Sequence, residues 1–120
     1  MKNEIQRGGV YYADLEPVLS SEQGGRRPVL VLQADDHNRT SPTTIIAPIT
    51  GQSKPDLPAH VRLNARFLSP PSIALLEQIR TVDKRRLGDY IGTISRAKLR
   101  EVEQAACAIL GITDLEELSQ

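Results

Sequence analysis

The chain has 120 residues, of which 39% are hydrophobic and 25% charged, and its formal net charge is zero. This length holds a single domain with a modest core, and the composition is typical of a globular protein. The balanced charge excludes a strong, non-specific nucleic-acid binder. The sequence contains no run of about 18 apolar residues, so we predict no membrane span. The first residues, MKNEIQRGG, lack the apolar centre of a signal peptide, so we expect a cytoplasmic location.

Six segments are predicted as strands, because they are short and either rich in strand-forming residues or alternate polar with apolar positions. They are residues 10–15, stopped by Pro17; 29–32, an apolar run expected to be buried on both faces; 43–47, closed by Pro48; and 60–63, 72–76 and 90–94. The segments 17–28, 34–42 and 51–58 are predicted as loops. Strands at this spacing favour a small barrel or a rolled sheet.

The C-terminal part changes to a helical period, which predicts an amphipathic helix over residues 95–110 that packs on the sheet. Ser95 is the expected N-cap and Gly111 the expected C-terminal stop. Residues 114–118 are predicted to add one further turn. The apolar positions of the expected buried face are Leu99, Val102, Ala106, Ile109 and Leu110.

The cysteine and histidine content predicts no metal site. Cys107 is the only cysteine, so it forms no internal disulfide, and we expect it to pack as a small apolar residue. His37 and His60 lie far apart in the sequence, and neither has the spacing of a metal-binding motif. We therefore expect neither a metal ion nor another cofactor.

The segment Ser21–Pro28 carries the most unusual combination of residues. Gly24 and Gly25 permit backbone angles that other residues avoid, and they let a ligand approach the main chain closely. Glu22 and Arg27 flank them, and Arg27 stands at the mouth of a predicted buried strand, where a side chain is held more rigidly than on a loop. The pattern alone leaves two interpretations open, a plain turn or a functional site.

Two further segments are candidates for the same site. Thr50 lies at the end of the third predicted strand, just past Pro48, where its hydroxyl can donate to a phosphate oxygen, although threonine is common at strand ends. Residues 77–81 place four polar side chains after a predicted buried strand, so they either line a groove or pair with one another on the surface. If the first strand alternates, one of Tyr11 and Tyr12 must face outward.

The order and spacing of these segments resemble the MazF/PemK family of toxin ribonucleases over roughly residues 7–112. Gly9 departs from that family, in which an acidic residue is usual, and such differences leave the loop shapes and the RNA sequence preference open. The resemblance rests on Arg7-Gly8, Val10-Tyr11, Asp14-Leu15, Pro17, Ser21–Gly25, Arg27–Val31, Ser41–Thr43, Pro48–Thr50, Leu57-Pro58, His60-Val61 and Leu76–Lys84.

The resemblance implies one mainly β domain over residues 1–120, with an SH3-like barrel at about 7–94 and a C-terminal amphipathic helix at about 95–110. It also implies a homodimer that cleaves single-stranded RNA at short sequences without a metal ion, and a cognate antitoxin that inhibits it. Arg27 and Thr50 match catalytic positions of the family, and Glu22 matches an acidic residue of its site. The expected RNA contacts are Tyr11, Gln23, Gly24, Gly25, Gln78 and Arg80.

Elementary chemistry agrees with this expectation. RNA is cut without a metal when its own 2′-OH attacks the neighbouring phosphorus, which requires a base, an acid for the departing 5′-oxygen, and donors for the charged phosphorane. The fork of Arg27 matches phosphate oxygens, and Thr50 adds a donor. Because the pKa of arginine lies above about 12, Arg27 is a poor sole base. Glu22, a water or the substrate itself is left to move the proton.

Two other function classes stay open. A gyrase poison of the CcdB type shares the barrel but acts through an aromatic-containing C-terminus, and this chain ends ELSQ. A plain SH3-like interaction module needs an aromatic-lined groove, and aromatic residues make up only 3% of the chain. Incubation with a long RNA in EDTA separates the three classes, because only the ribonuclease leaves discrete fragments.

Overall fold

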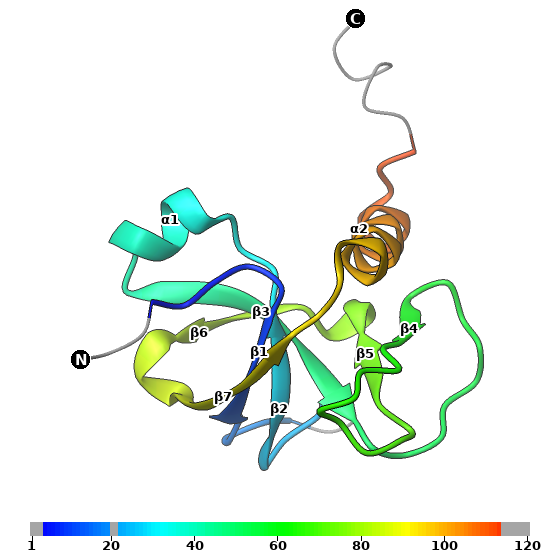
Figure 1. Ribbon diagram of the computed structural model, residues 1–120, viewed down its shortest axis with the longest axis horizontal. Helices are drawn as coiled ribbons and strands as arrows, with labels where there is room; N and C mark the ends of the chain where they lie inside the picture. Colours follow the sequence, from blue (N-terminus) through cyan, green and yellow to red (C-terminus); the bar gives the residue numbers. More distant parts are fainter. Residues whose placement is uncertain (1–3, 20–21, 114–120) are drawn as a thin grey trace, which may run out of the picture.

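The computed structural model describes residues 4–19 and 22–113. Two α-helices, α1 (Asp35–Thr40) and α2 (Arg96–Leu110), and two 3-10 turns, η1 (Leu76–Gln78) and η2 (Lys84–Arg86), connect or follow the strands. In Figure 1, α2 lies over β4 and β5, and α1 lies beside β3 on the other side of the molecule. The strands are β1 (Gly9–Asp14), β2 (Arg26–Val31), β3 (Thr43–Thr50), β4 (His60–Arg62), β5 (Ile73–Leu75), β6 (Arg80–Asp83) and β7 (Leu87–Thr93).

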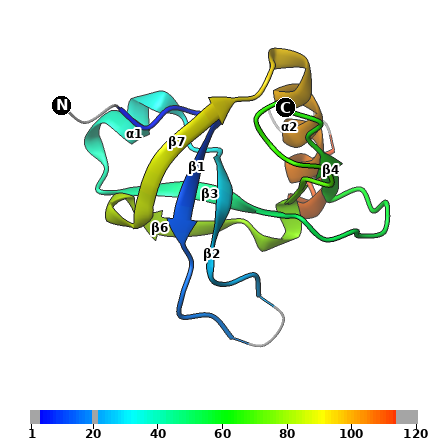
Figure 2. The same cartoon turned by 60° about the horizontal axis from the view of Figure 1, so that its bottom comes forward.

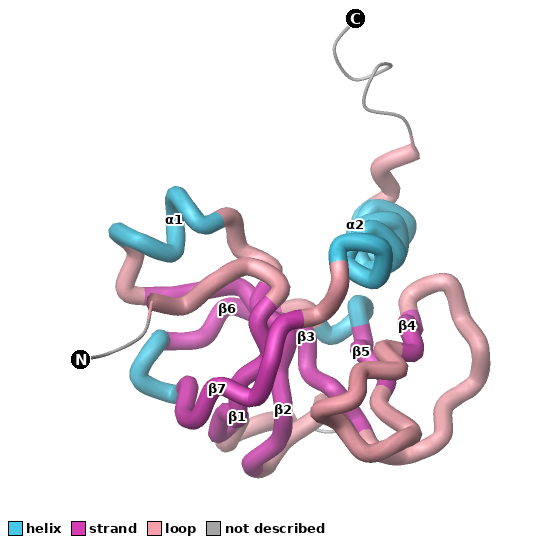
Figure 3. The backbone as a smooth tube through the Cα atoms, in the orientation of Figure 1, coloured by secondary structure: helices cyan, strands magenta, loops and turns pink. Residues whose placement is uncertain are grey.

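One antiparallel sheet holds all seven strands, with the long strand β3 at its centre. β3 pairs with β2 on one side, and on the other with β6 through residues 43–46 and then with β5 through residues 49 and 50. The sheet is rolled (Figures 2 and 3), yet within the described residues no pairing joins its outer strands β4 and β7. The predicted mainly β class with a C-terminal helix is confirmed, but the barrel is open.

The core consists of two clusters that share the wall formed by β2. Leu30 faces the cluster beneath α2, where it joins Ile49, Leu76 and Val102. Val29 and Val31 point to the opposite face and pack with Tyr11, Leu15, Ile46 and Val82. Val29, Leu30 and Val31 have no exposed surface, so the prediction of a strand buried on both faces is confirmed. The residues that open β2 are thereby attached to a strand whose following residues are fully buried.

Helix α2 has the predicted ends but a shorter buried face. The Ser95 hydroxyl accepts the Lys98 N–H at 3.1 Å, and Gly111 ends the helix in the left-handed conformation with φ 75°. Val102 and Ala105 are buried, whereas Ile109 is 46% and Leu110 66% exposed. The last turn of the predicted apolar face is therefore left uncovered.

Neither described helix is long and apolar enough to cross a membrane. The turn predicted at 114–118 lies outside the described residues.

Two local predictions were wrong, and one strand was not predicted. Pro48 does not close β3, which continues to Thr50. On the edge of β3 opposite β2, the pairing with β6 ends at residue 46 and the pairing with β5 begins at residue 49. Residue 48 falls in this gap, where the N–H that proline lacks is not needed. Residues 35–40, expected in a loop, form α1, which buries only Asn38 and so has no apolar period to detect. Residues 80–83 form β6, in which only Val82 is buried.

Candidate active site

Arg27 is held at the start of β2 by two backbone carbonyl groups. Its Nε donates to the Gly24 carbonyl at 2.7 Å and its Nη1 to the Ile49 carbonyl at 3.4 Å. The two acceptors come from the β1–β2 connection and from β3, so they fix the plane of the half-buried guanidinium. The other N–H groups of Arg27 have no protein acceptor within the described residues. The arrangement is a positively charged fork with free donors.

Thr50 lies beside this arginine, because it follows the Ile49 carbonyl that Arg27 contacts. Its side chain is only 1% exposed, and its hydroxyl oxygen accepts the Gln52 N–H at 3.1 Å. The hydroxyl hydrogen is therefore still available to donate. Because the residue is covered, a phosphate reaches its hydroxyl only when neighbouring groups move aside.

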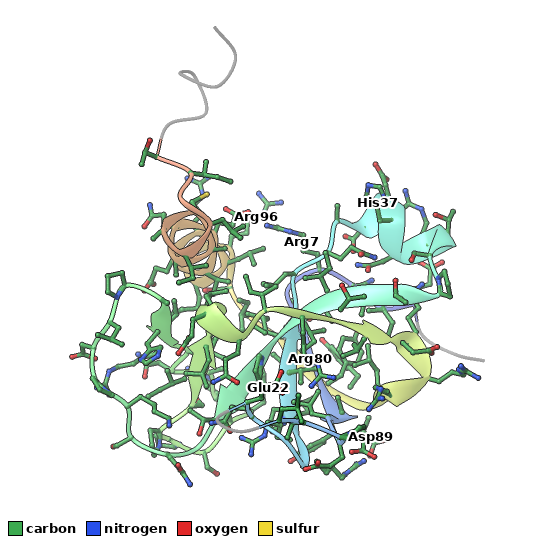
Figure 4. All side chains as sticks on the ribbon, turned by 180° about the vertical axis from the view of Figure 1, so that it is seen from behind. Arg7, Glu22, His37, Arg80, Asp89 and Arg96 are labelled. Carbon is green, nitrogen blue, oxygen red and sulfur yellow. The ribbon has the colours of Figure 1, made fainter. Side chains whose placement is uncertain are left out.

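The other predicted site residues gather around the β1–β2 connection. The Gln23 N–H donates to Gln78 Oε1 at 2.7 Å, which ties this connection to η1, and Arg80 Nη1 donates to the Leu15 carbonyl at 3.2 Å. Glu22 is exposed, and its carboxylate accepts the Leu19 N–H. Figure 4 shows Glu22 and Arg80 in the same part of the molecule, away from His37 and Arg96. The structure thus brings all the predicted site residues except Tyr11 into one region.

Tyr11 is the exception. It is 4% exposed, its hydroxyl accepts the Gln6 N–H at 3.2 Å, and burial raises its pKa. Tyr12 is 38% exposed and carries the Arg26 guanidinium 5.1 Å from its ring centroid. The prediction that one of the two tyrosines faces outward is confirmed, and that residue is Tyr12. The RNA contact expected of Tyr11 therefore lacks an accessible surface.

The pair formed by His60 and Glu77 was not anticipated from the sequence. His60 Nε2 lies 2.7 Å from Glu77 Oε2, and its Nδ1 lies 2.8 Å from the Pro55 carbonyl. β5 separates this histidine from Thr50, since Thr50 pairs with Ile73 and His60 with Leu75. From the sequence, we considered His60 only as a metal ligand. Its partner Glu77 lies 17 residues away, and no sequence pattern indicates that the two side chains meet. A titratable histidine thus lies across β5 from Thr50 and is paired with Glu77, the chain neighbour of Gln78.

The surroundings of His60 favour its charged form, in which both ring nitrogens carry a proton. Both ring nitrogens face oxygen acceptors, and imidazole donates from both only when it is charged. Burial lowers the pKa of His60, and Lys54 adds to this effect, but the bonds to Pro55 and Glu77 and the charge of Glu77 outweigh them. The net pKa therefore lies above its ordinary value of 6.5.

We expect Glu77→Gln to lower the pKa of His60, because the substitution removes the negative charge that favours the imidazolium. Titration of the His60 ring signals by NMR measures this, and a His37→Gln background leaves a single histidine to follow. Because the folded-state pKa is raised, the pairing stabilises the fold fully below the unfolded value of about 6.5 and is lost as pH rises through the folded value. An unchanged pKa in Glu77→Gln would contradict this assignment.

Comparison with known proteins identifies the relatives of this chain. The family described as "PemK-like, MazF-like toxin of type II toxin-antitoxin system" matches residues 6–110. Endoribonuclease EndoA of Bacillus subtilis (strain 168) is 49% identical over 113 residues, which cover 92% of this chain and 97% of that protein.

Solved structures agree. MazF from Deinococcus radiodurans has a TM-score of 0.82 at 27% identity, over 92% of this chain and 99% of that one. A MazE–MazF structure from the same organism has a TM-score of 0.75 at 26% identity, over 93% and 100%. Fold and relatives together define the class of toxin endoribonucleases. The chain belongs to the PemK-like, MazF-like toxin family of type II toxin–antitoxin systems.

Proposed function

We propose that the protein cleaves single-stranded RNA, mRNA in particular, at short specific sequences, without a metal ion, by attack of the 2′-OH on the adjacent phosphorus. The observation that carries this proposal is the guanidinium of Arg27, fixed by the Gly24 and Ile49 carbonyls while its other N–H groups meet no acceptor among the described residues. Fixed donors stabilise a developing phosphorane charge without reorganising during the reaction. The products are a 2′,3′-cyclic phosphate and a 5′-OH.

The other groups take the remaining roles. Thr50 donates its hydroxyl hydrogen to a phosphate oxygen once the residues covering it have moved. Glu22 is our candidate for the base, since it carries an exposed carboxylate on the same connection as Gly24. His60, whose pKa is raised, is our candidate for the acid that protonates the 5′-oxygen.

In this proposal, polar groups beside Arg27 determine which RNA sequences are cut. Single-stranded RNA is read by hydrogen bonds to base edges and by stacking. Gln23, Gln78 and Arg80 lie around the β1–β2 connection, where they can reach base edges, and Gly24 and Gly25 let the strand approach the backbone closely. The outward Tyr12, with Arg26 on its ring, offers the stacking surface that was expected of Tyr11.

The reaction type is tested with the substrate rather than the enzyme. A single 2′-deoxy sugar just before the cut removes the nucleophile, so we expect that RNA to resist cleavage while its all-ribo counterpart is cut in EDTA. Mass spectrometry of the fragments should show a 2′,3′-cyclic phosphate. Cleavage of the deoxy-substituted strand, or activity that EDTA abolishes and magnesium restores, would instead indicate a metal mechanism.

We also propose that the chain works in the cytoplasm as a homodimer and is inhibited there by a cognate antitoxin. The MazE–MazF structure of a relative supports the partner, and the small core of one copy supports the dimer, the commonest symmetric assembly. A saturating antitoxin tail should displace an uncleavable RNA analogue. We propose that the antitoxin inhibits by covering the RNA site, so simultaneous binding of both without mutual weakening would contradict this idea. A monomer by light scattering at micromolar concentration would contradict the dimer.

A further inference from the structure

One carboxylate outside the predicted site holds the peptide that orients Arg27. Glu16, just after β1, accepts the Gly25 N–H through Oε1 at 2.8 Å. The Gly24 carbonyl, which accepts Arg27 Nε at 2.7 Å, belongs to the same peptide bond as this N–H. Because a peptide unit is planar and stiff, its N–H end and its carbonyl end move together. Glu16 and Arg27 are thus joined through one rigid group.

We propose that Glu16 is a positioning residue for Arg27 and acts through the Gly24–Gly25 peptide. The negative carboxylate on the N–H end polarises the peptide, which strengthens the carbonyl end as an acceptor for the guanidinium. The inference rests on the proposed role of Arg27 in cleavage. It assigns Glu16 no contact with RNA and no proton transfer, and it separates Glu16 from Glu22, whose carboxylate binds the Leu19 N–H instead.

The two glycines serve this arrangement in different ways. A Cβ at residue 24 would lie 2.6 Å from Glu16 Oε1 and 2.6 Å from Val18 Cγ2, so the carboxylate fits only because residue 24 has no side chain. Gly25 has φ +74° with nothing near its missing Cβ, so it supplies the backbone turn that aims its N–H at Glu16. Both glycines are explained by the contact with Glu16.

The backbone from which Glu16 projects is itself fixed. Arg86 Nη1 donates to the Glu16 carbonyl and, at 3.2 Å, to the Asp14 carbonyl. Arg80 Nη1 donates to the Leu15 carbonyl at 3.2 Å, and the Glu16 N–H donates to Asp14 Oδ1 at 3.0 Å. Three successive carbonyls are therefore bound by arginines, and the carboxylate starts from a defined position.

The test compares Glu16→Ala with Glu16→Gln in steady-state cleavage of a short RNA that spans a mapped cut site. Misplacing a catalytic group costs up to about a hundredfold in rate, so we expect Glu16→Ala to lower kcat about ten- to a hundredfold with KM unchanged. Glu16→Gln keeps an oxygen acceptor for the Gly25 N–H and should restore most of the rate. Asp36→Ala, which removes an equal charge from exposed α1, should cleave like wild type. A wild-type kcat in Glu16→Ala, or a change in KM alone, would overturn the proposal.

A double-mutant cycle separates this inference from the proposed function. If Glu16 acts only through Arg27, Glu16→Ala should cause no further loss in an Arg27→Ala background. A further tenfold loss there would show that Glu16 acts on its own, and the positioning role would be wrong although Arg27 keeps its role. Full activity of Arg27→Ala would instead defeat the proposed role of Arg27. If Glu16→Ala does not fold, Glu16→Asp, whose carboxylate is one methylene shorter and cannot keep the 2.8 Å contact with the Gly25 N–H, replaces it in the same cycle.

Discussion

Arg27→Ala protein should fold normally and lose at least about a hundredfold in cleavage rate, since removing one fixed donor to a transition-state anion costs this much in other enzymes. The loss should fall on kcat, because the interaction is stronger with the phosphorane than with the ground-state phosphate. Initial rates on a short fluorescent RNA, together with the thermal unfolding midpoint, measure both parts of the expectation. Arg27→Lys should rescue poorly, because an ammonium lacks the planar fork that two carbonyls hold here.

The matched control for Arg27 is its neighbour in the sequence. Arg26 is exposed and rests on the Tyr12 ring, whereas Arg27 bonds to the Gly24 and Ile49 carbonyls. Arg26→Ala removes the same charge but only a proposed RNA-binding contact, so we expect kcat to stay near that of wild type while KM rises. Equal losses in the two variants would show that the site needs only positive charge. A folded Arg27→Ala protein that cleaves at the wild-type rate would remove the central residue of the proposal.

The parts of the fold that the sequence predicted are those in which burial leaves a pattern. β2 was predicted because Val29, Leu30 and Val31 fill two clusters and must all be apolar. Helix α2 was predicted from its period and from Ser95 and Gly111, which satisfy its ends. By contrast, α1 buries only Asn38, whose side chain bonds Gln33 and Thr44, so a polar sequence forms a helix there without an amphipathic signal.

The residues of the candidate site also differ in whether the sequence alone could reveal them. Arg27 and Thr50 could be placed because each lies just outside a predicted strand, 29–32 or 43–47, and because the family resemblance covers both. Glu16 and His60 could not be found in this way, since their roles depend on partners that only the fold brings near, Gly25 and Glu77. The RNA contact of Tyr11 stays a prediction, because alternation shows that one of two neighbouring tyrosines faces outward without showing which, and the structure buries Tyr11. Contacts distant in sequence, rather than residue types, carry the missing information.

Leu76→Ala should lower the free energy of unfolding by about 2–5 kcal/mol, the range for a leucine deleted from a packed core. Leu76 is 1% exposed, lies in the cluster beneath α2, and opens η1, where its N–H donates to the Ala59 carbonyl at 2.9 Å. Leu57→Ala is the control, because that leucine is 51% exposed and should change stability by no more than about 0.5 kcal/mol. Urea unfolding with an unchanged m-value measures both variants. Similar losses in the two would mean that η1, which carries Glu77 and Gln78, does not rest on a packed core.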